Sequence, residues 1–172
     1  IGDNAFQLCS RLQNVIIRKG VTAIRIETFN KCGSLKSIEI PESVTSIGKN
    51  AFSYCLNLES IIIPRGVTSI ESETFSSCSS LLNIEIPDCV ASIGESAFYL
   101  CRLLPSITLP KSLKSIEFRV FSYCEKLQSV IIPEKVTSID QYAFQSCYVL
   151  ENVIIPDSVT SIGICSFNNC MI

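Results

Sequence analysis

The sequence predicts a repeat protein of the α/β class: a solenoid whose stacked coils form a parallel β-sheet on one side and carry short helical turns on the other. Three observations predict it. One phrase recurs with a fixed period of 23 residues along the whole chain. Each copy contains a strand-like pattern that ends at proline, and each copy places apolar residues at the same positions. One short copy cannot bury those residues alone, whereas stacked copies cover one another.

The period is clearest in cysteine and phenylalanine. Seven complete units fill residues 1–161 and part of an eighth fills residues 162–172, so we expect a single solenoid over residues 1–172. The chain begins on a core isoleucine and stops before the next leucine is due, which predicts a fragment of a longer array whose uncapped end coils self-associate. The rows are Cys9, Cys32, Cys55, Cys78, Cys101, Cys124, Cys147 and Cys170, and Phe6, Phe29, Phe52, Phe75, Phe98, Phe121, Phe144 and Phe167.

The elements of one unit follow from its residue pattern. Residues 61–63 are three isoleucines, which predicts a short strand whose outer side chains point one way and whose middle side chain points the other. Pro64 is expected to end the strand because proline lacks an N–H. The V-T-S-I residues 67–70 are predicted to turn the chain. The segment GKNAFSYC, residues 48–55, has the small residue, the aromatic residue and the spacing of one short helical turn.

The full phrase, found at residues 58–78 as LESIIIPRGVTSIESETFSSC, resembles the BspA-like leucine-rich repeat family. The resemblance covers the whole chain in eight copies that stay in phase. It implies a curved leucine-rich-repeat solenoid with a concave parallel sheet, displayed on the surface of bacteria or mucosal protists or secreted by them. Departures are few: Arg18 replaces the proline, Ala91 and Lys114 replace threonine, and Phe118 and Val120 make the sixth unit irregular.

The resemblance implies a binding or adhesion module whose partner is a protein or a glycan, on a host or a neighbouring cell. An alternative is a structural spacer or intracellular scaffold, in which the repeats only build length and other domains bind. A signal peptide or a surface anchor in the full reading frame would favour the first function over the second.

Composition argues against several other classes. A formal net charge of −2 gives no electrostatic reason to bind nucleic acid, and the apolar runs fall far short of the roughly 18 residues that span a bilayer. There is no histidine, no phosphate-binding or nucleophile-elbow motif, and no pair of cysteines with the close spacing of a metal site. We therefore expect no catalytic residues, no metal, no cofactor and no enzyme activity.

The ten cysteines allow two states. In-register side chains from neighbouring coils point in parallel, which keeps their Cβ atoms farther apart than the value near 3.8 Å that disulfides prefer. We therefore favour buried free thiols that serve as small apolar residues, and disulfides between coils remain the alternative. Cys89 and Cys165 lie outside the repeating row and are expected to be partly exposed.

A second period of two units lies beneath the first. Odd units carry the phrases IGDNAF, IGKNAF and IGESAF, whereas even units carry IRIETF, IESETF and IEFRVF. The residue after the proline position also alternates between basic and acidic until the last step. Neighbouring charges of opposite sign avoid repulsion along the stack, and a recognition stripe on this rim is the alternative. The candidate rim residues are Lys19, Glu42, Arg65, Asp88, Lys111, Glu134 and Asp157.

The predicted concave face supplies the candidate partner-binding residues. Its central row is the outward strand position, flanked by asparagine and serine. Four of the seven residues in this row are isoleucine, where solvent contact is expected. Ile131 and Ile154 are neighbours in the stack, so the C-terminal half of this face is our predicted binding patch. The row consists of Ile16, Glu39, Ile62, Glu85, Thr108, Ile131 and Ile154.

Overall fold

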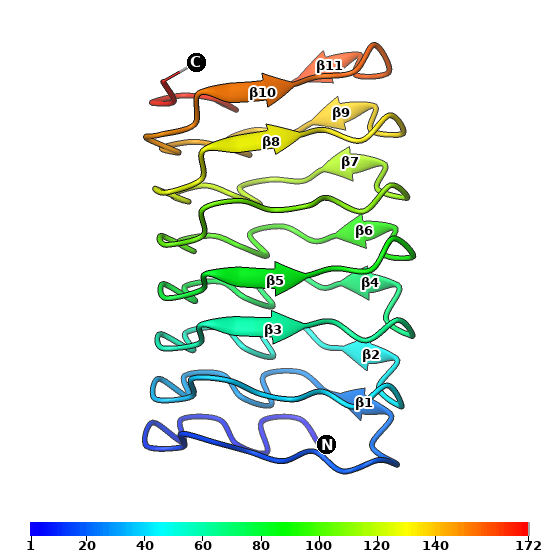
Figure 1. Ribbon diagram of the computed structural model, residues 1–172, viewed down its shortest axis with the longest axis vertical. Helices are drawn as coiled ribbons and strands as arrows, with labels where there is room; N and C mark the ends of the chain where they lie inside the picture. The colour runs from blue at the N-terminus through cyan, green and yellow to red at the C-terminus, as the bar shows by residue number, and fades with distance from the viewer. Residues whose placement is uncertain (172) are drawn as a thin grey trace.

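The computed structural model describes residues 1–171, and Ile172 lies outside the described part. The chain forms a stack of coils that rises from the N-terminus to the C-terminus, with two rows of short strands on opposite walls (Figure 1). All strand pairs are parallel, and each residue pairs with the residue 23 positions away in the next coil, as in Ser60 with Asn83. This register confirms the solenoid that the period predicted.

The first row of strands lies where the I-x-I-P phrase predicts it. Its strands are β3 (Ser60–Ile62), β5 (Asn83–Glu85), β8 (Ser129–Ile131) and β10 (Asn152–Ile154). Isolated parallel bridges, such as Ile16 with Glu39, continue the row between and before these strands. Ile61 and Ile63 are buried and Ile62 is exposed, so the predicted alternation is confirmed.

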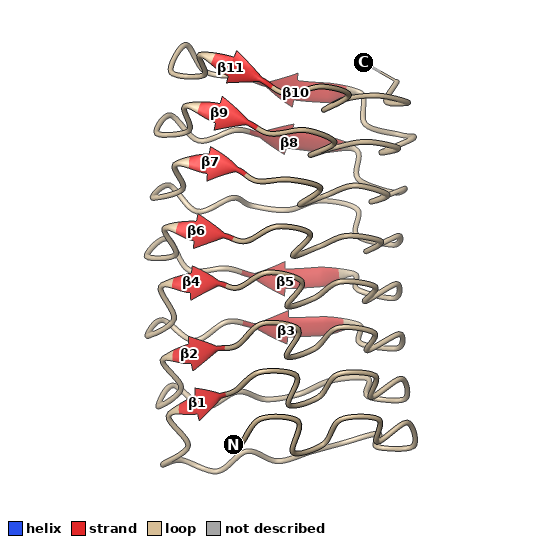
Figure 2. Cartoon of the chain, turned by 180° about the vertical axis from the view of Figure 1, so that it is seen from behind, coloured by secondary structure: helices blue, strands red, loops and turns tan. Residues whose placement is uncertain are grey.

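A second row of strands occupies the V-T-S-I segments, which we predicted to be turns. It consists of β1 (Ala23–Ile24), β2 (Ser46–Ile47), β4 (Ser69–Ile70), β6 (Ser92–Ile93), β7 (Ser115–Ile116), β9 (Ser138–Ile139) and β11 (Ser161–Ile162). Figure 2 views the molecule from the side opposite to Figure 1, and this row of strands lies nearest the viewer there. The prediction was wrong because β-branched residues favour extended backbone and neighbouring coils pair there: the Thr45 N–H donates to the Thr22 oxygen at 2.9 Å.

The predicted short helical turns do not form: residues 1–171 contain no helix. In the segment where we expected one, Asn50 and Tyr54 have left-handed backbone with φ of 56° and 59°. The Phe52 N–H donates to the Thr74 oxygen of the next coil at 2.9 Å, whereas the Ser53 N–H donates back to Asn50 at 3.1 Å. Alternate amides thus bond to the next coil and to a local turn, so no run of bonds to the residue four positions earlier can develop.

The core consists of continuous rows that run through the stack. Rings of successive phenylalanines lie parallel at centroid distances of 5.2–5.6 Å, for example 5.6 Å between Phe75 and Phe98. Leucine, isoleucine, valine and cysteine rows surround this ladder and are almost fully buried in the central coils. Because each side chain packs mainly on its counterparts one coil away, the fold is maintained by contacts between nearest neighbours.

The two-unit alternation has a structural basis at its glycines. A Cβ on Gly94 would lie 2.6 Å from the Ser72 nitrogen of the preceding coil, so no larger residue fits without movement of the backbone. A Cβ on Gly48 would meet the Ile26 nitrogen at 2.7 Å in the same way. The preceding coils instead carry a buried threonine, and the Thr74 hydroxyl donates to the Glu71 oxygen at 2.7 Å.

Burial decreases at the end coils. Ile162 is 53% exposed, whereas its counterpart Ile139 one coil earlier is 1% exposed. Phe6 and Phe167, the first and last rings of the ladder, are only partly buried. The outermost coils therefore expose the rows that form the core elsewhere.

Candidate interaction surfaces

The exposed side of the first strand row, which we call the β3 face, carries the predicted central row. All seven predicted residues of that row are exposed. Ile131 and Ile154 lie directly opposite each other in the pairing of β8 with β10, and they are 66% and 60% exposed. Exposed polar residues border them, including Gln128 and Glu151. The sheet register therefore joins these two isoleucines into one apolar patch with a polar border.

The other isoleucines of the row stand alone. Ile16, which is 84% exposed, bridges to Glu39, and Ile62, which is 59% exposed, pairs with Glu85. Each therefore has a carboxylate as a neighbour in the stack. Single exposed apolar residues of this kind are ordinary on protein surfaces.

The seven predicted rim residues are also exposed, but several serve the stack itself. Lys111 Nζ lies 3.5 Å from Asp88 Oδ2, with side chains 86% and 62% exposed. The acidic side chains also accept amide hydrogen bonds from the next coil: the Lys111 N–H donates to Asp88 and the Arg65 N–H donates to Glu42, both at 3.3 Å. Exposed ion pairs contribute about 0–1 kcal/mol each, so these contacts support the structural explanation of the alternation at the Glu42–Arg65 and Asp88–Lys111 steps.

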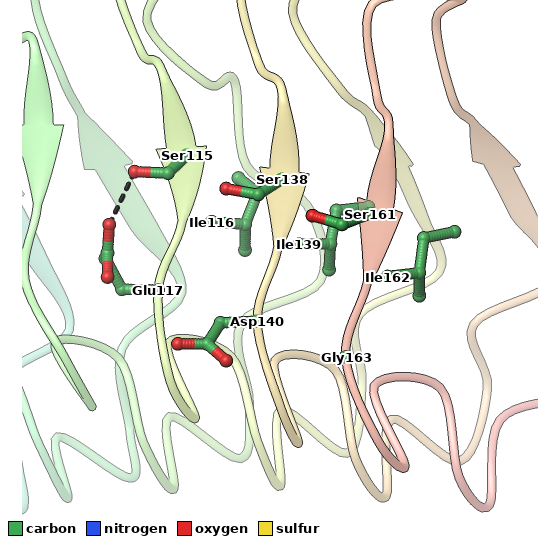
Figure 3. Close-up of a pocket in the computed structure, with 9 residues that line it drawn as sticks. All are labelled: Ser115, Ile116, Glu117, Ser138, Ile139, Asp140, Ser161, Ile162 and Gly163. Atoms are coloured by element: carbon green, nitrogen blue, oxygen red, sulfur yellow. Dashed lines mark hydrogen bonds between the residues drawn. The ribbon is translucent and has the colours of Figure 1, made fainter.

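The opposite wall has a groove that sequence reasoning missed. We call the exposed side of the second strand row the β4 face, and the groove of about 170 Å³ lies on it across three neighbouring coils (Figure 3). It is lined by Ser115, Ile116, Glu117, Ser138, Ile139, Asp140, Ser161, Ile162 and Gly163. The signal was present in the sequence as a serine recurring every 23 residues, but we assigned that segment to a turn.

The cysteine ladder forms a buried row of free thiols, and all ten cysteines are unpaired. Each ladder thiol from the second coil onward donates to the backbone oxygen of a phenylalanine, as Cys78 Sγ does to Phe52 at 3.2 Å. Burial raises the pKa of the Cys32 thiol to about 11 and raises the pKa values of Cys78 and Cys101 well above their ordinary value. These thiols are therefore poor nucleophiles and metal ligands. Cys89 and Cys165 are exposed, as predicted.

Two further features of the structure concern metal binding and membrane insertion. Among residues 1–171, no three His, Cys, Asp or Glu side chains converge as a metal ion would require. Across the same residues, the structure has no helix with the length and apolar character to cross a membrane.

In-register 23-residue coils with parallel strands and inward leucine, isoleucine, phenylalanine and cysteine rows define a leucine-rich-repeat solenoid. The sequence profile of the BspA type leucine rich repeat region matches residues 1–103 and 68–172, in 6 copies. The chain belongs to this family, which confirms the resemblance seen in its sequence. No curated protein matches it.

Solved structures of bacterial proteins are similar to the chain. A leucine-rich repeat protein of T. pallidum is 34% identical, with a TM-score of 0.82 over 88% of this chain and 71% of its own. A leucine rich cell surface protein of Faecalibacterium prausnitzii is 31% identical, with a TM-score of 0.65 over 96% of this chain. A leucine-rich repeat protein of Bacteroides ovatus is 29% identical, with a TM-score of 0.72 over 93% of this chain. The chain spans 59% and 49% of the last two proteins.

Proposed function

We propose that the chain is a non-enzymatic binding or adhesion module of a cell-surface or secreted protein, and that it attaches to a protein or glycan partner through the β3 face. The observation that carries the proposal is the apolar pair of Ile131 and Ile154, 66% and 60% exposed and paired across β8 and β10. An apolar centre with a polar border is the composition of many interaction patches. The cell-surface relative of F. prausnitzii supports the proposed location.

The double substitution Ile131→Ser and Ile154→Ser tests this proposal. We expect it to weaken adhesion of beads coated with the chain to cultured epithelial cells by about tenfold or more, which corresponds to about 1.4 kcal/mol. The thermal unfolding midpoint should barely change, because both side chains are already exposed in the folded chain. The measurement is the number of beads retained per cell, together with unfolding followed by circular dichroism.

A matched control uses the isolated isoleucines. Ile16→Ser and Ile62→Ser change the same residue type at the same strand position, next to Glu39 and Glu85 instead of a second isoleucine. They should leave adhesion within about twofold of the original value. If the Ile131 and Ile154 double variant adheres normally while substitutions along the Lys19-to-Asp157 rim abolish adhesion, the rim is the site. Unmodified chain that adheres to no cell would favour a spacer.

A further partner that we propose is a second copy of the chain, which stacks on the exposed end coils. A polypeptide of these 172 residues is expected to self-associate as its concentration rises, because Ile162 and Phe167 expose the core rows at one end of the stack. Sedimentation velocity over a hundredfold range of concentration would measure it, and Ile162→Lys should weaken it. A monodisperse monomer at high concentration would contradict this proposal.

A further inference from the structure

Coils 116–138 and 139–161 depart from the repeating pattern on the β4 face. The second position of each unit alternates between glycine and a charged residue up to Glu117, but the next unit carries Asp140 where glycine is due. Phe118, one residue after Glu117, is the only one of the 9 phenylalanines outside the core ladder. The other coils fold without an aspartate or a phenylalanine at these positions, so we examine what these residues do at the surface.

Polar groups converge at this place. Figure 3 shows the hydroxyls of Ser115, Ser138 and Ser161 in one row along the groove. The Ser115 hydroxyl donates to Glu117 Oε1 at 2.5 Å, which leaves the other carboxylate oxygen of Glu117 free to accept. The Asp140 carboxylate accepts the Gln141 N–H at 2.6 Å through Oδ1 alone. Acceptors and hydroxyls thus line a groove whose floor includes the isoleucines of three coils.

An aromatic cluster begins where the groove residues end. The Arg119 guanidinium lies 4.9 Å from the centroid of the Phe118 ring and 5.4 Å from that of Tyr142. The two rings meet edge to face at a centroid distance of 5.9 Å. Phe118 follows Glu117 directly and Tyr142 comes two residues after Asp140. The Cα atoms of these two aromatic residues therefore lie within about 8 Å of the Cα atoms of groove residues, so the cluster borders the groove.

We propose that this groove and the adjoining aromatic cluster bind a neutral oligosaccharide. A sugar ring presents hydroxyls around its edge and apolar C–H groups on its faces, so it needs acceptors and hydroxyls beside an apolar or aromatic surface. Glu117, Asp140 and the serine row supply the acceptors and hydroxyls, and Tyr142 with Phe118 supplies the aromatic surface. The site is separate from the β3 face and does not depend on its function.

Charge and size narrow the ligand class. The two carboxylates of the groove would repel a sialylated or sulfated glycan, and the guanidinium of Arg119 already stacks on two rings. A groove of about 170 Å³ is smaller than the roughly 300–1,000 Å³ of pockets that enclose a small molecule. The ligand therefore lies across the surface and extends beyond the groove, as one stretch of a longer sugar chain does.

An array of neutral, sialylated and sulfated oligosaccharides tests this inference with the labelled full chain. Binding to neutral members is expected, and Tyr142→Ala and Asp140→Asn should each weaken it by about tenfold. Two matched variants control for folding and charge. Tyr54 has the same left-handed backbone, with φ of 59° against 60° for Tyr142, and a cation, Lys31, over its ring. Glu71 accepts the Ser69 hydroxyl as Glu117 accepts that of Ser115.

Tyr54→Ala and Glu71→Gln should bind the neutral glycans within about twofold of the original chain, since both lie in coils outside the groove. The Ile131 and Ile154 double variant should also bind them unchanged, which separates this site from the β3 face. Three results would overturn the inference: no neutral oligosaccharide retained above background, retention of sialylated or sulfated members only, or neutral binding that survives both Tyr142→Ala and Asp140→Asn.

Discussion

Replacing Phe75 by alanine is expected to lower the free energy of unfolding by about 3–5 kcal/mol. Its ring is fully buried and lies between those of Phe52 and Phe98, each 5.6 Å away. The substitution removes contacts on both sides and leaves a cavity in the middle of the stack, where no free end allows the coils to close over it. Urea unfolding followed by circular dichroism would measure the change.

Phe118→Ala is the control, because it removes the same ring from outside the ladder. The Phe118 ring is half-buried and packs on Arg119 and Tyr142 at the surface, so its loss should cost about 1 kcal/mol or less. Equal decreases in the free energy of unfolding for the two variants would show that a ring in the ladder contributes no more to stability than a ring outside it. A Phe75→Ala chain that unfolds in two steps would instead show that the stack separates into two halves at the cavity.

A thiol reagent should distinguish two classes of cysteine in the native chain by orders of magnitude in rate. Cys89 and Cys165 are exposed and are expected to react within the first phase, together with Cys9 of the first coil. Cys78 and Cys101 are fully buried, and burial holds their pKa values well above the ordinary value, so they should react only through unfolding. All ten should titrate in denaturant; fewer than ten without reductant would reveal disulfides.

The same thiols give stability a dependence on pH. Their folded-state pKa values are raised above the ordinary value of 9.0, so in alkaline solution the unfolded chain loses protons that the folded chain keeps. The contribution of these protonated thiols to the free energy of unfolding is complete below pH 9.0 and is lost as the pH rises above that value. Urea midpoints in reducing buffer should therefore fall between pH 9 and 10, and Cys78→Ala should reduce that fall.

The sequence was sufficient to predict the stack and its inward rows, because Phe75, Cys78 and their counterparts recur in step and can be buried only by neighbouring coils. The sequence was not sufficient to predict the backbone conformation of the segments that contain these phenylalanines and cysteines. Left-handed backbone at Tyr54 costs about 1–2 kcal/mol, and no local signal marks it, whereas asparagine, as at Asn50, adopts this backbone more readily. Amide bonds to the next coil compensate for it, and such bonds depend on a neighbour that a single unit does not reveal.

The candidate surfaces also differ in whether the sequence could predict them. The exposure of Ile131 and Ile154 could be predicted, since strand side chains alternate and the buried neighbours were identified by their period. The groove could not, because Ser115, Ser138 and Ser161 were assigned to turns, and a second row of paired strands that presents their hydroxyls on one face was not expected. Phe118 was noted as an irregularity, but its packing with Arg119 and Tyr142 needed the geometry of two coils.

The fit of glycine against the preceding coil constrains how a gene for such a protein can change its length. Gly48 and Gly94 each pack on a coil of the other kind, so deleting one coil would place two glycine coils or two threonine coils together. Deleting two coils restores the original partners. Recombination between repeats should therefore be tolerated most readily in steps of two.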